Sequence, residues 1–139
     1  MTYDIIVKES NFYFMKKLSD IIKEQSNKGE KDNTAFIVTT KVAILKAWYE
    51  SNKKDSDKKT DFYCGITNDF DERKSQHESQ DHNGKAISNY KTIDCKKKNI
   101  AVKVEEKMGK MGFDIGNPPH PGNGAVDDTT IVYLYRKPE

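Results

Sequence analysis

From Asp61 onward the chain alternates between strand-like and helix-like segments, and this order limits the fold more than any other feature of the sequence. Apolar, β-branched and aromatic residues dominate the strand-like segments, whereas the segments between them place apolar residues at helical spacing, with Asn68 or Asp69 as the first N-cap. Short strands alternating with short helices predict an α+β fold in which helices flank a small antiparallel sheet. The segments in order are DFYCGIT, DERKSQHES, ISNYKTIDC, NIAVKVEEKMGKM and TTIVYLYRK.

A polar, charged stretch, SNKKDSDKK, precedes this pattern and indicates a break in the chain. We therefore predict an N-terminal helical extension over residues 1–57 and an α+β core over residues 58–139. The extension begins with a helix after Ser10. AFIVTT, from Ala35 to Thr40, favours a strand followed by a helix, although the whole region also fits one helix. We expect the N-terminal helices to assemble a homodimer or a higher homo-oligomer.

The composition narrows the classes of partner. Hydrophobic residues make up 35% and charged residues 33%, which predicts a modest core, and the net charge of +2 does not by itself indicate nucleic acid. No apolar run approaches the roughly 20 residues that span a bilayer, so we expect no membrane partner and a cytoplasmic protein, in the host cytoplasm if a phage encodes it. Cys64 and Cys95 lack zinc spacing and are expected to be buried thiols.

One group of residues has the side chains that a catalytic or binding site needs. Tyr63 ends the first strand of the core, Arg73 follows on the next helix, and His77 lies four residues after Arg73 on the same helical face. A guanidinium stabilises charge on a phosphate, and a phenol or an imidazole moves a proton. These residue types in this order indicate phosphodiester chemistry. Arg136, the other arginine, is a candidate phosphate-binding residue.

The run YCGITNDFDERKSQH resembles the second half of the GIY-YIG nuclease motif, close to Y-x-G-x-T-x-x-x-x-x-R-x-x-x-H. The resemblance implies that Tyr63, Arg73 and His77 belong to an active site. It also implies that a glutamate on the later helix, Glu105 with Glu106 as the alternative, binds one Mg²⁺ or Mn²⁺ ion. The matching positions are Tyr63, Gly65, Thr67, Asn68, Arg73 and His77.

That family normally supplies a second tyrosine from a strand just upstream, where this chain has SNKKDSDKKT. Two arrangements would fill the gap. Either AFIVTT is the partner strand, without a tyrosine, or the last strand pairs beside DFYCGIT in a permuted order. In the second arrangement, which we favour, Tyr133 or Tyr135 replaces the missing tyrosine, and both point to the same face because alternate residues of a strand do so.

The loop GNPPHPGNG lacks the pattern of a P-loop, but Gly122 and Gly124 would let backbone amides approach a phosphate closely. His82 and His120 have no potential ligand partner at a spacing that indicates a site, so we assign them no role.

These observations leave three functions open, one of them a structural or interaction protein that uses its N-terminal helices for assembly. The first is a GIY-YIG-like, metal-dependent endonuclease, a hydrolase that binds and cuts DNA. The alternative is a catalytically inactive relative, from a phage or a bacterial mobile element, that sequesters a phosphate-bearing nucleotide such as a cyclic nucleotide or a cyclic ADP-ribose immune signal. The alternative needs no metal.

Overall fold

The computed structural model of the chain describes residues 17–20, 33–116 and 125–139. The chain divides into two compact units, residues 1–52 and residues 53–139. Residues 17–20 are helical, and the rest of the helix predicted after Ser10 lies outside the described residues. The assembly predicted for the N-terminal helices, and the loop residues Gly122 and Gly124, also fall outside this part of the chain.

The described part of the first unit is dominated by α2, Thr34–Asn52. The strand predicted over Ala35–Thr40 is therefore wrong, and with it the arrangement that made this segment a partner strand. Buried residues at spacings of four, three and four define one helical face, which overrides the β-propensity of the branched residues. The Thr40 hydroxyl also donates to the Phe36 carbonyl one turn earlier, at 2.9 Å, as a helical threonine does. The buried face consists of Val38, Val42, Leu45 and Tyr49.

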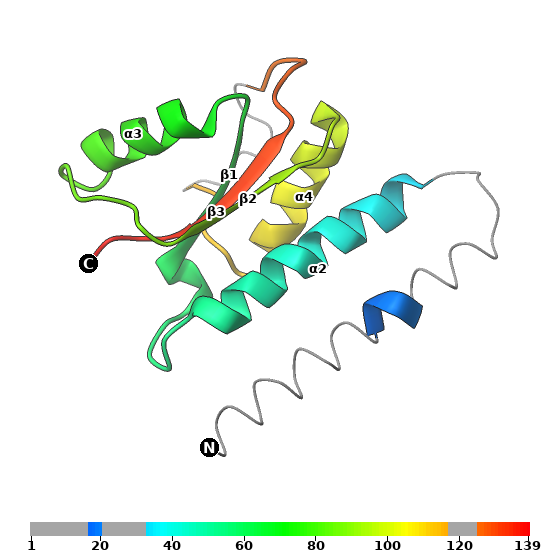
Figure 1. Cartoon of the computed structure of the whole chain (residues 1–139), viewed down its shortest axis with the longest axis horizontal. Helices are drawn as coiled ribbons and strands as arrows, with labels where there is room; N and C mark the ends of the chain where they lie inside the picture. The colour runs from blue at the N-terminus through cyan, green and yellow to red at the C-terminus, as the bar shows by residue number, and fades with distance from the viewer. Residues whose placement is uncertain (1–16, 21–32, 117–124) are drawn as a thin grey trace. The chain divides into compact units, whose positions relative to one another are not determined.

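The second unit has the α+β order that the sequence predicts (Figure 1). A short 3₁₀ turn over Lys59–Asp61 leads into the first strand. Its strands form one antiparallel sheet in the spatial order β1-β3-β2, so the last strand is central and pairs with β1. This pairing is the one required by the permuted arrangement. The elements are β1 Phe62–Thr67, α3 Phe70–Gln80, β2 Tyr90–Asp94, α4 Lys98–Lys110 and β3 Ile131–Arg136.

The strand register gives the sheet two different faces. Cys64 lies opposite Leu134, and Val132 lies opposite Ile93, and all four side chains are buried. Helix α4 packs against β1 and β3 and presents the buried residues Ile100, Ala101, Val104 and Met108. Because side chains alternate along a strand, the other face carries Tyr63, Tyr133 and Tyr135. Figure 1 shows α3 and α4 on opposite sides of the sheet.

The second edge of β1 is also paired. The Cys64 amide donates to the Asp114 carbonyl at 2.8 Å, and the Asp114 amide donates to the Phe62 carbonyl at 3.1 Å. The segment after α4 therefore runs parallel to β1 at this point, and β1 is held on both sides. Among the described residues, no helix combines the length and the apolar character needed to cross a bilayer.

Candidate functional site

Three tyrosines form the centre of the candidate site, on the sheet face away from the α4-packed core. The Tyr63 ring centroid lies 6.2 Å from that of Tyr133 and 5.5 Å from that of Tyr135. Tyr133 and Tyr135 follow each other along β3 with their rings nearly parallel, at 6.3 Å. We call these three residues the tyrosine face. The pairing of β3 with β1 brings the predicted tyrosines together.

Gly65 makes room for this arrangement. It lies directly opposite Tyr133 in the register of β1 and β3. A Cβ atom built on Gly65 would stand 2.3 Å from the Tyr133 hydroxyl oxygen and 2.5 Å from Cζ of the same ring. The glycine of the Y-x-G sequence is therefore needed here for a close approach of a side chain, because its backbone φ is not in the left-handed region.

Helix α3 begins at a turn built from the polar residues Thr67, Asn68 and Asp69. The Thr67 hydroxyl donates to the Asp69 carbonyl at 3.0 Å, and the Asn68 amide reaches the Asp128 carboxylate at 3.3 Å. Asp69 is the N-cap, and its carboxylate accepts from the Glu72 amide at 3.1 Å. This turn directs α3 back over the tyrosine face.

His77 connects α3 to the tyrosine face. Its Nε2 lies 2.7 Å from the Tyr133 hydroxyl, and its Nδ1 lies 2.6 Å from an Asp81 carboxylate oxygen. A carboxylate only accepts hydrogen bonds, so Nδ1 donates to Asp81 and the neutral ring accepts the Tyr133 proton at Nε2. Burial lowers the pKa of His77, against the opposing effect of Asp81, which favours the neutral ring. Asp81, His77 and Tyr133 thus form a hydrogen-bonded chain that leads from solvent to the centre of the face.

Arg73 lies one turn earlier on α3, beside the phenols. Burial alone would lower its pKa, but the hydrogen bond with Tyr133 and the interaction with Tyr63 outweigh this effect and the pKa is raised. Nη1 also donates to the Gln76 side chain at 3.0 Å. The guanidinium is therefore charged, half-buried and held in place, which suits an anion-binding group.

Burial raises the pKa of each phenol of the tyrosine face. For Tyr63 the charges of Glu105 and Asp114 add to this effect, while Arg73 opposes it. The phenols are consequently neutral hydroxyls that donate and accept hydrogen bonds. Tyr133, Tyr135 and His77 are 1%, 2% and 1% exposed, so solvent reaches the site through Tyr63 and Arg73, which are only partly buried.

His82 has no role that its spacing in the sequence predicts, yet its Nε2 lies 2.9 Å from the Tyr135 hydroxyl. The turn after α3 positions it, with Asn83 at φ 54° and Gly84 at φ 83°. The Glu78 carboxylate accepts from the Ile87 amide at 2.6 Å and fixes the end of this turn. Asp81 was also missed, although its place four residues after His77 on a helix is a usable signal.

Glu105 is buried on α4, 6% exposed, and its charge helps to raise the pKa of both Tyr63 and Cys64. Glu106 is exposed and pairs with Lys110 at 3.2 Å, so Glu105 is the glutamate on the sheet side of the helix. Within residues 17–20, 33–116 and 125–139, no three His, Cys, Asp or Glu side chains are grouped to enclose a metal ion. One carboxylate fits Mg²⁺ or Mn²⁺ bound mainly by water and substrate oxygens, and does not fit a structural zinc site.

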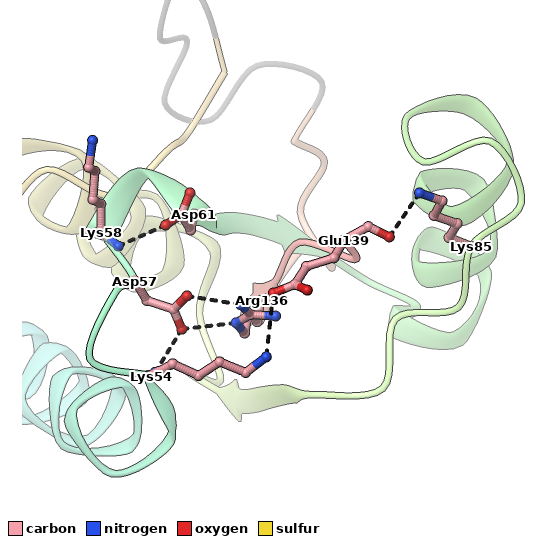
Figure 2. Close-up of polar contacts among 7 residues, drawn as sticks. All are labelled: Lys54, Asp57, Lys58, Asp61, Lys85, Arg136 and Glu139. Carbon is pink, nitrogen blue, oxygen red and sulfur yellow. Dashed lines mark hydrogen bonds and ion pairs between the residues drawn. The ribbon is translucent and has the colours of Figure 1, made fainter.

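Arg136 is not part of this cluster. It alternates with Tyr135 and faces the opposite side of the sheet, where Nε and Nη2 donate to the two Asp57 carboxylate oxygens, each at 2.9 Å. Nη2 also reaches Glu139 at 2.7 Å, and the Lys54 amide donates to Asp57 at 2.8 Å (Figure 2). The guanidinium predicted to bind a phosphate is thus engaged by carboxylates within the chain.

The chain was compared with protein-family models, with curated proteins and with solved structures, and no match was found.

Proposed function

We propose that the chain is a metal-dependent endonuclease that hydrolyses phosphodiester bonds in DNA with a GIY-YIG-like site. The observation that carries this proposal is the convergence of Arg73, Tyr63 and the Asp81–His77–Tyr133 chain on one sheet face. Each component is a group that phosphodiester hydrolysis uses, and the pairing of β3 with β1 places a second tyrosine beside Tyr63. The resemblance of Tyr63–His77 to the family motif supports the same proposal.

The roles follow from exposure and hydrogen bonding. Arg73 binds a non-bridging phosphate oxygen and stabilises the charge that develops at phosphorus. The Tyr63 hydroxyl, partly exposed, orients the attacking water. Tyr133 and His77 are positioning residues, since Tyr133 hydrogen-bonds Arg73 and His77 holds the Tyr133 hydroxyl, and together they offer the proton a path to Asp81. Glu105 lies on α4, on the other side of the sheet from α3 (Figure 1), but its charge acts on Tyr63 and helps to raise the pKa of that phenol. From this side it would hold a divalent cation, which supplies Lewis-acid stabilisation of the phosphate when bound.

The test is nicking of supercoiled plasmid with Mg²⁺ or Mn²⁺. We expect Arg73→Ala to lower the rate by about 10²–10³-fold, as removal of a group that stabilises transition-state charge does. Arg73→Lys keeps the charge and should restore only part of the activity, because the planar fork is lost. Glu105→Gln should abolish nicking, while the neighbouring Glu106→Gln serves as the matched control and should retain it. No nicking by folded wild-type protein with either metal ion would contradict the endonuclease.

A second candidate is a protein that binds a phosphate-bearing nucleotide without cutting it. The observation that favours it is burial: His77, Tyr133 and Tyr135 are nearly sealed from solvent, and the pKa of each phenol is raised. Buried neutral groups suit a rigid support for Arg73 better than proton transfer to a substrate. Thermal-shift screening of linear and cyclic nucleotides, including a cyclic ADP-ribose, tests this candidate. A stabilisation that Arg73→Ala removes, together with absent nicking, would favour binding over hydrolysis.

A further inference from the structure

An open pocket of about 450 Å³ lies beside the tyrosine face, at the start of α3. It is lined by Asp69, Phe70 and Asp71 from the helix start and by Tyr90 and Thr92 from β2. In the register of the sheet, Tyr90 lies opposite Tyr135 and Thr92 lies opposite Tyr133. The pocket and the tyrosine face therefore share one face of the sheet, and the pocket is large enough for a small organic ligand.

The pocket has an aromatic wall that is open to solvent. Tyr90 is 44% exposed, and in the described part of the chain Val126 is the one other large hydrophobic residue with such exposure. The Phe70 ring lies 4.9 Å from the Tyr90 ring and 5.4 Å from the Tyr133 ring. Exposed aromatic rings in a groove bind nucleobases by stacking, since every base has a π face.

The polar groups of the pocket are mostly hydrogen-bond acceptors. One Asp69 oxygen accepts from the Glu72 amide, and the Asp69 residue lines the pocket. Asp71 is exposed and makes no hydrogen bond or ion pair within residues 17–20, 33–116 and 125–139. Two carboxylates repel a phosphate and attract a ligand edge that carries N–H donors. Among the bases, guanine presents two adjacent donors, N1–H and the 2-amino group, which one carboxylate accepts together.

The phosphate end of such a ligand would be directed toward a cation on the same helix. Arg73 lies three residues after Phe70 and therefore on the same side of α3. Lys74 also lies near the pocket, with Nζ 5.9 Å from the Tyr90 ring centroid, although it pairs with Glu78 at 3.1 Å. Acidic residues at the helix start and a guanidinium one turn later give the ligand a direction, base toward Asp71 and phosphate toward Arg73.

We propose that this pocket binds an unpaired guanine base of the nucleotide whose phosphate Arg73 holds. The proposal rests on the proposed phosphate-binding role of Arg73 and adds a base-recognition site to it. Stacking on Tyr90 requires a base outside a duplex, so the preferred nucleic acid is single-stranded or has a base displaced from the stack.

The test is an NMR titration of the ¹⁵N-labelled full chain with guanosine 5′-monophosphate, adenosine 5′-monophosphate and ribose 5-phosphate. We expect guanosine monophosphate to bind about tenfold more tightly than ribose 5-phosphate, and Tyr90→Ala to remove the difference. Tyr90→Phe retains the ring and should bind as the wild type does. Asp71→Asn should lower the preference for guanosine over adenosine monophosphate about tenfold, whereas Asp55→Asn, an exposed carboxylate in a turn outside the pocket, should not.

The outcomes separate this site from the proposed function. Equal binding of guanosine monophosphate and ribose 5-phosphate, guanosine monophosphate binding that Tyr90→Ala leaves unchanged, or no binding at millimolar ligand would overturn the base pocket. Plasmid nicking that depends on Arg73 would then still support the endonuclease. Conversely, Tyr90-dependent binding without any nicking would support the base pocket, and it would contradict only the proposed hydrolysis.

Discussion

Gly65 and Tyr133 show how closely the candidate site is packed. The phenol of Tyr133 occupies the space where a side chain at position 65 would be, and it is held there by His77. A side chain added at position 65 must therefore displace a buried, hydrogen-bonded ring. Overpacking of a well-filled site costs about 1–3 kcal/mol.

We accordingly predict that Gly65→Ala lowers the free energy of unfolding by about 1–3 kcal/mol, as measured by urea denaturation. The double variant Gly65→Ala with Tyr133→Ala removes the clash, so its loss should be smaller than the sum of the two single losses. Strictly additive losses would show that the contact between these positions does not cause the effect.

The buried imidazole of His77 predicts a pH dependence. Its pKa is lowered in the folded chain, so below the unfolded value of about 6.5 the unfolded chain binds more protons. The stabilisation is complete above about pH 6.5 and is lost as the pH falls from there toward the folded pKa. Carboxylates with lowered pKa values, such as Asp57 and Asp114, act in a separate window below about pH 4.

The measurement is the free energy of unfolding between pH 7 and pH 5. Wild type should lose stability across this range, whereas His77→Gln should give a flatter profile whatever its absolute stability. Ser79→Ala, an exposed position on the same helix, is the control and should keep the wild-type slope, because it removes no titratable group. A wild-type slope in His77→Gln would assign the titration to another group.

At the scale of single residues, the sequence predicts those contacts that follow from a fixed spacing along one strand or one helix. Tyr63, Arg73 and His77 come together because one sheet face and one helical face carry them. Tyr63 lies at the beginning of β1, so the prediction that it ends the strand is wrong. His82 was missed because its contact with Tyr135 depends on the left-handed turn at Asn83 and Gly84, which reverses the chain after α3. Contacts made through such a turn have no fixed spacing.

Among the secondary-structure elements, β3 contributes most to the arrangement of the sheet and of the candidate site. It is central in the sheet, and its two faces have different tasks, phenols on one side and Val132, Leu134 and Arg136 on the other. Its alternation was visible in the sequence, and so was its possible pairing with β1. The partner of Arg136 was not, since Asp57 lies 79 residues away in a charged stretch that reads as solvated surface.

The Asp57–Arg136 pair predicts a large effect for a residue in a polar connection. The Asp57 side chain is 4% exposed, and the hydrogen bond from Arg136 lowers its pKa to about 2. Removing one partner of a buried pair leaves the other charge unpaired and typically costs about 3–5 kcal/mol. Because Arg136 remains 15% exposed, we expect Asp57→Ala to cost about 3 kcal/mol, at the lower end of this range.

Thermal and urea unfolding of Asp57→Ala and Arg136→Lys test this pair, and the lysine should not replace the two-point contact. Glu106→Gln is the control, because its pair with Lys110 is exposed and lies outside the Asp57–Arg136 contact, so this variant should keep nearly the wild-type stability. The stabilisation from Asp57 should also be lost as the pH falls from about 4 to about 2. A wild-type stability of Asp57→Ala would show that the pair contributes nothing.

Helix α2 shows that a short sequence pattern does not always predict the correct secondary structure. The run Ala35–Thr40 favours a strand by propensity, yet Val38, Val42, Leu45 and Tyr49 are buried at helical spacing. Burial of a continuous apolar face contributes more than the small preference of branched residues for strands. A choice between two such patterns cannot be made from a six-residue window.

Across the whole molecule the net charge of +2 conceals a separation of charge between two helical segments. Residues 96–110, which include α4, hold six lysines and two glutamates, whereas residues 69–81, which include α3, hold five acidic residues, one arginine and one lysine. A nucleic acid backbone would therefore be attracted along α4 and repelled at the start of α3, where the proposed base pocket lies. Lys103 and Lys107 are exposed neighbours four residues apart on α4.

If the chain binds DNA, phosphate contacts along α4 should set the salt dependence of binding. Each phosphate neutralised contributes about 0.9 to the slope of log K against log salt concentration, so Lys103→Gln with Lys107→Gln should reduce the slope by about 2. Fluorescence anisotropy with a labelled duplex at several salt concentrations measures it. Lys54→Gln with Lys58→Gln removes the same charge from the connection before β1 and should leave the slope unchanged. Equal reductions in the two double variants would mean that binding follows net charge, and that α4 holds no defined place on the DNA.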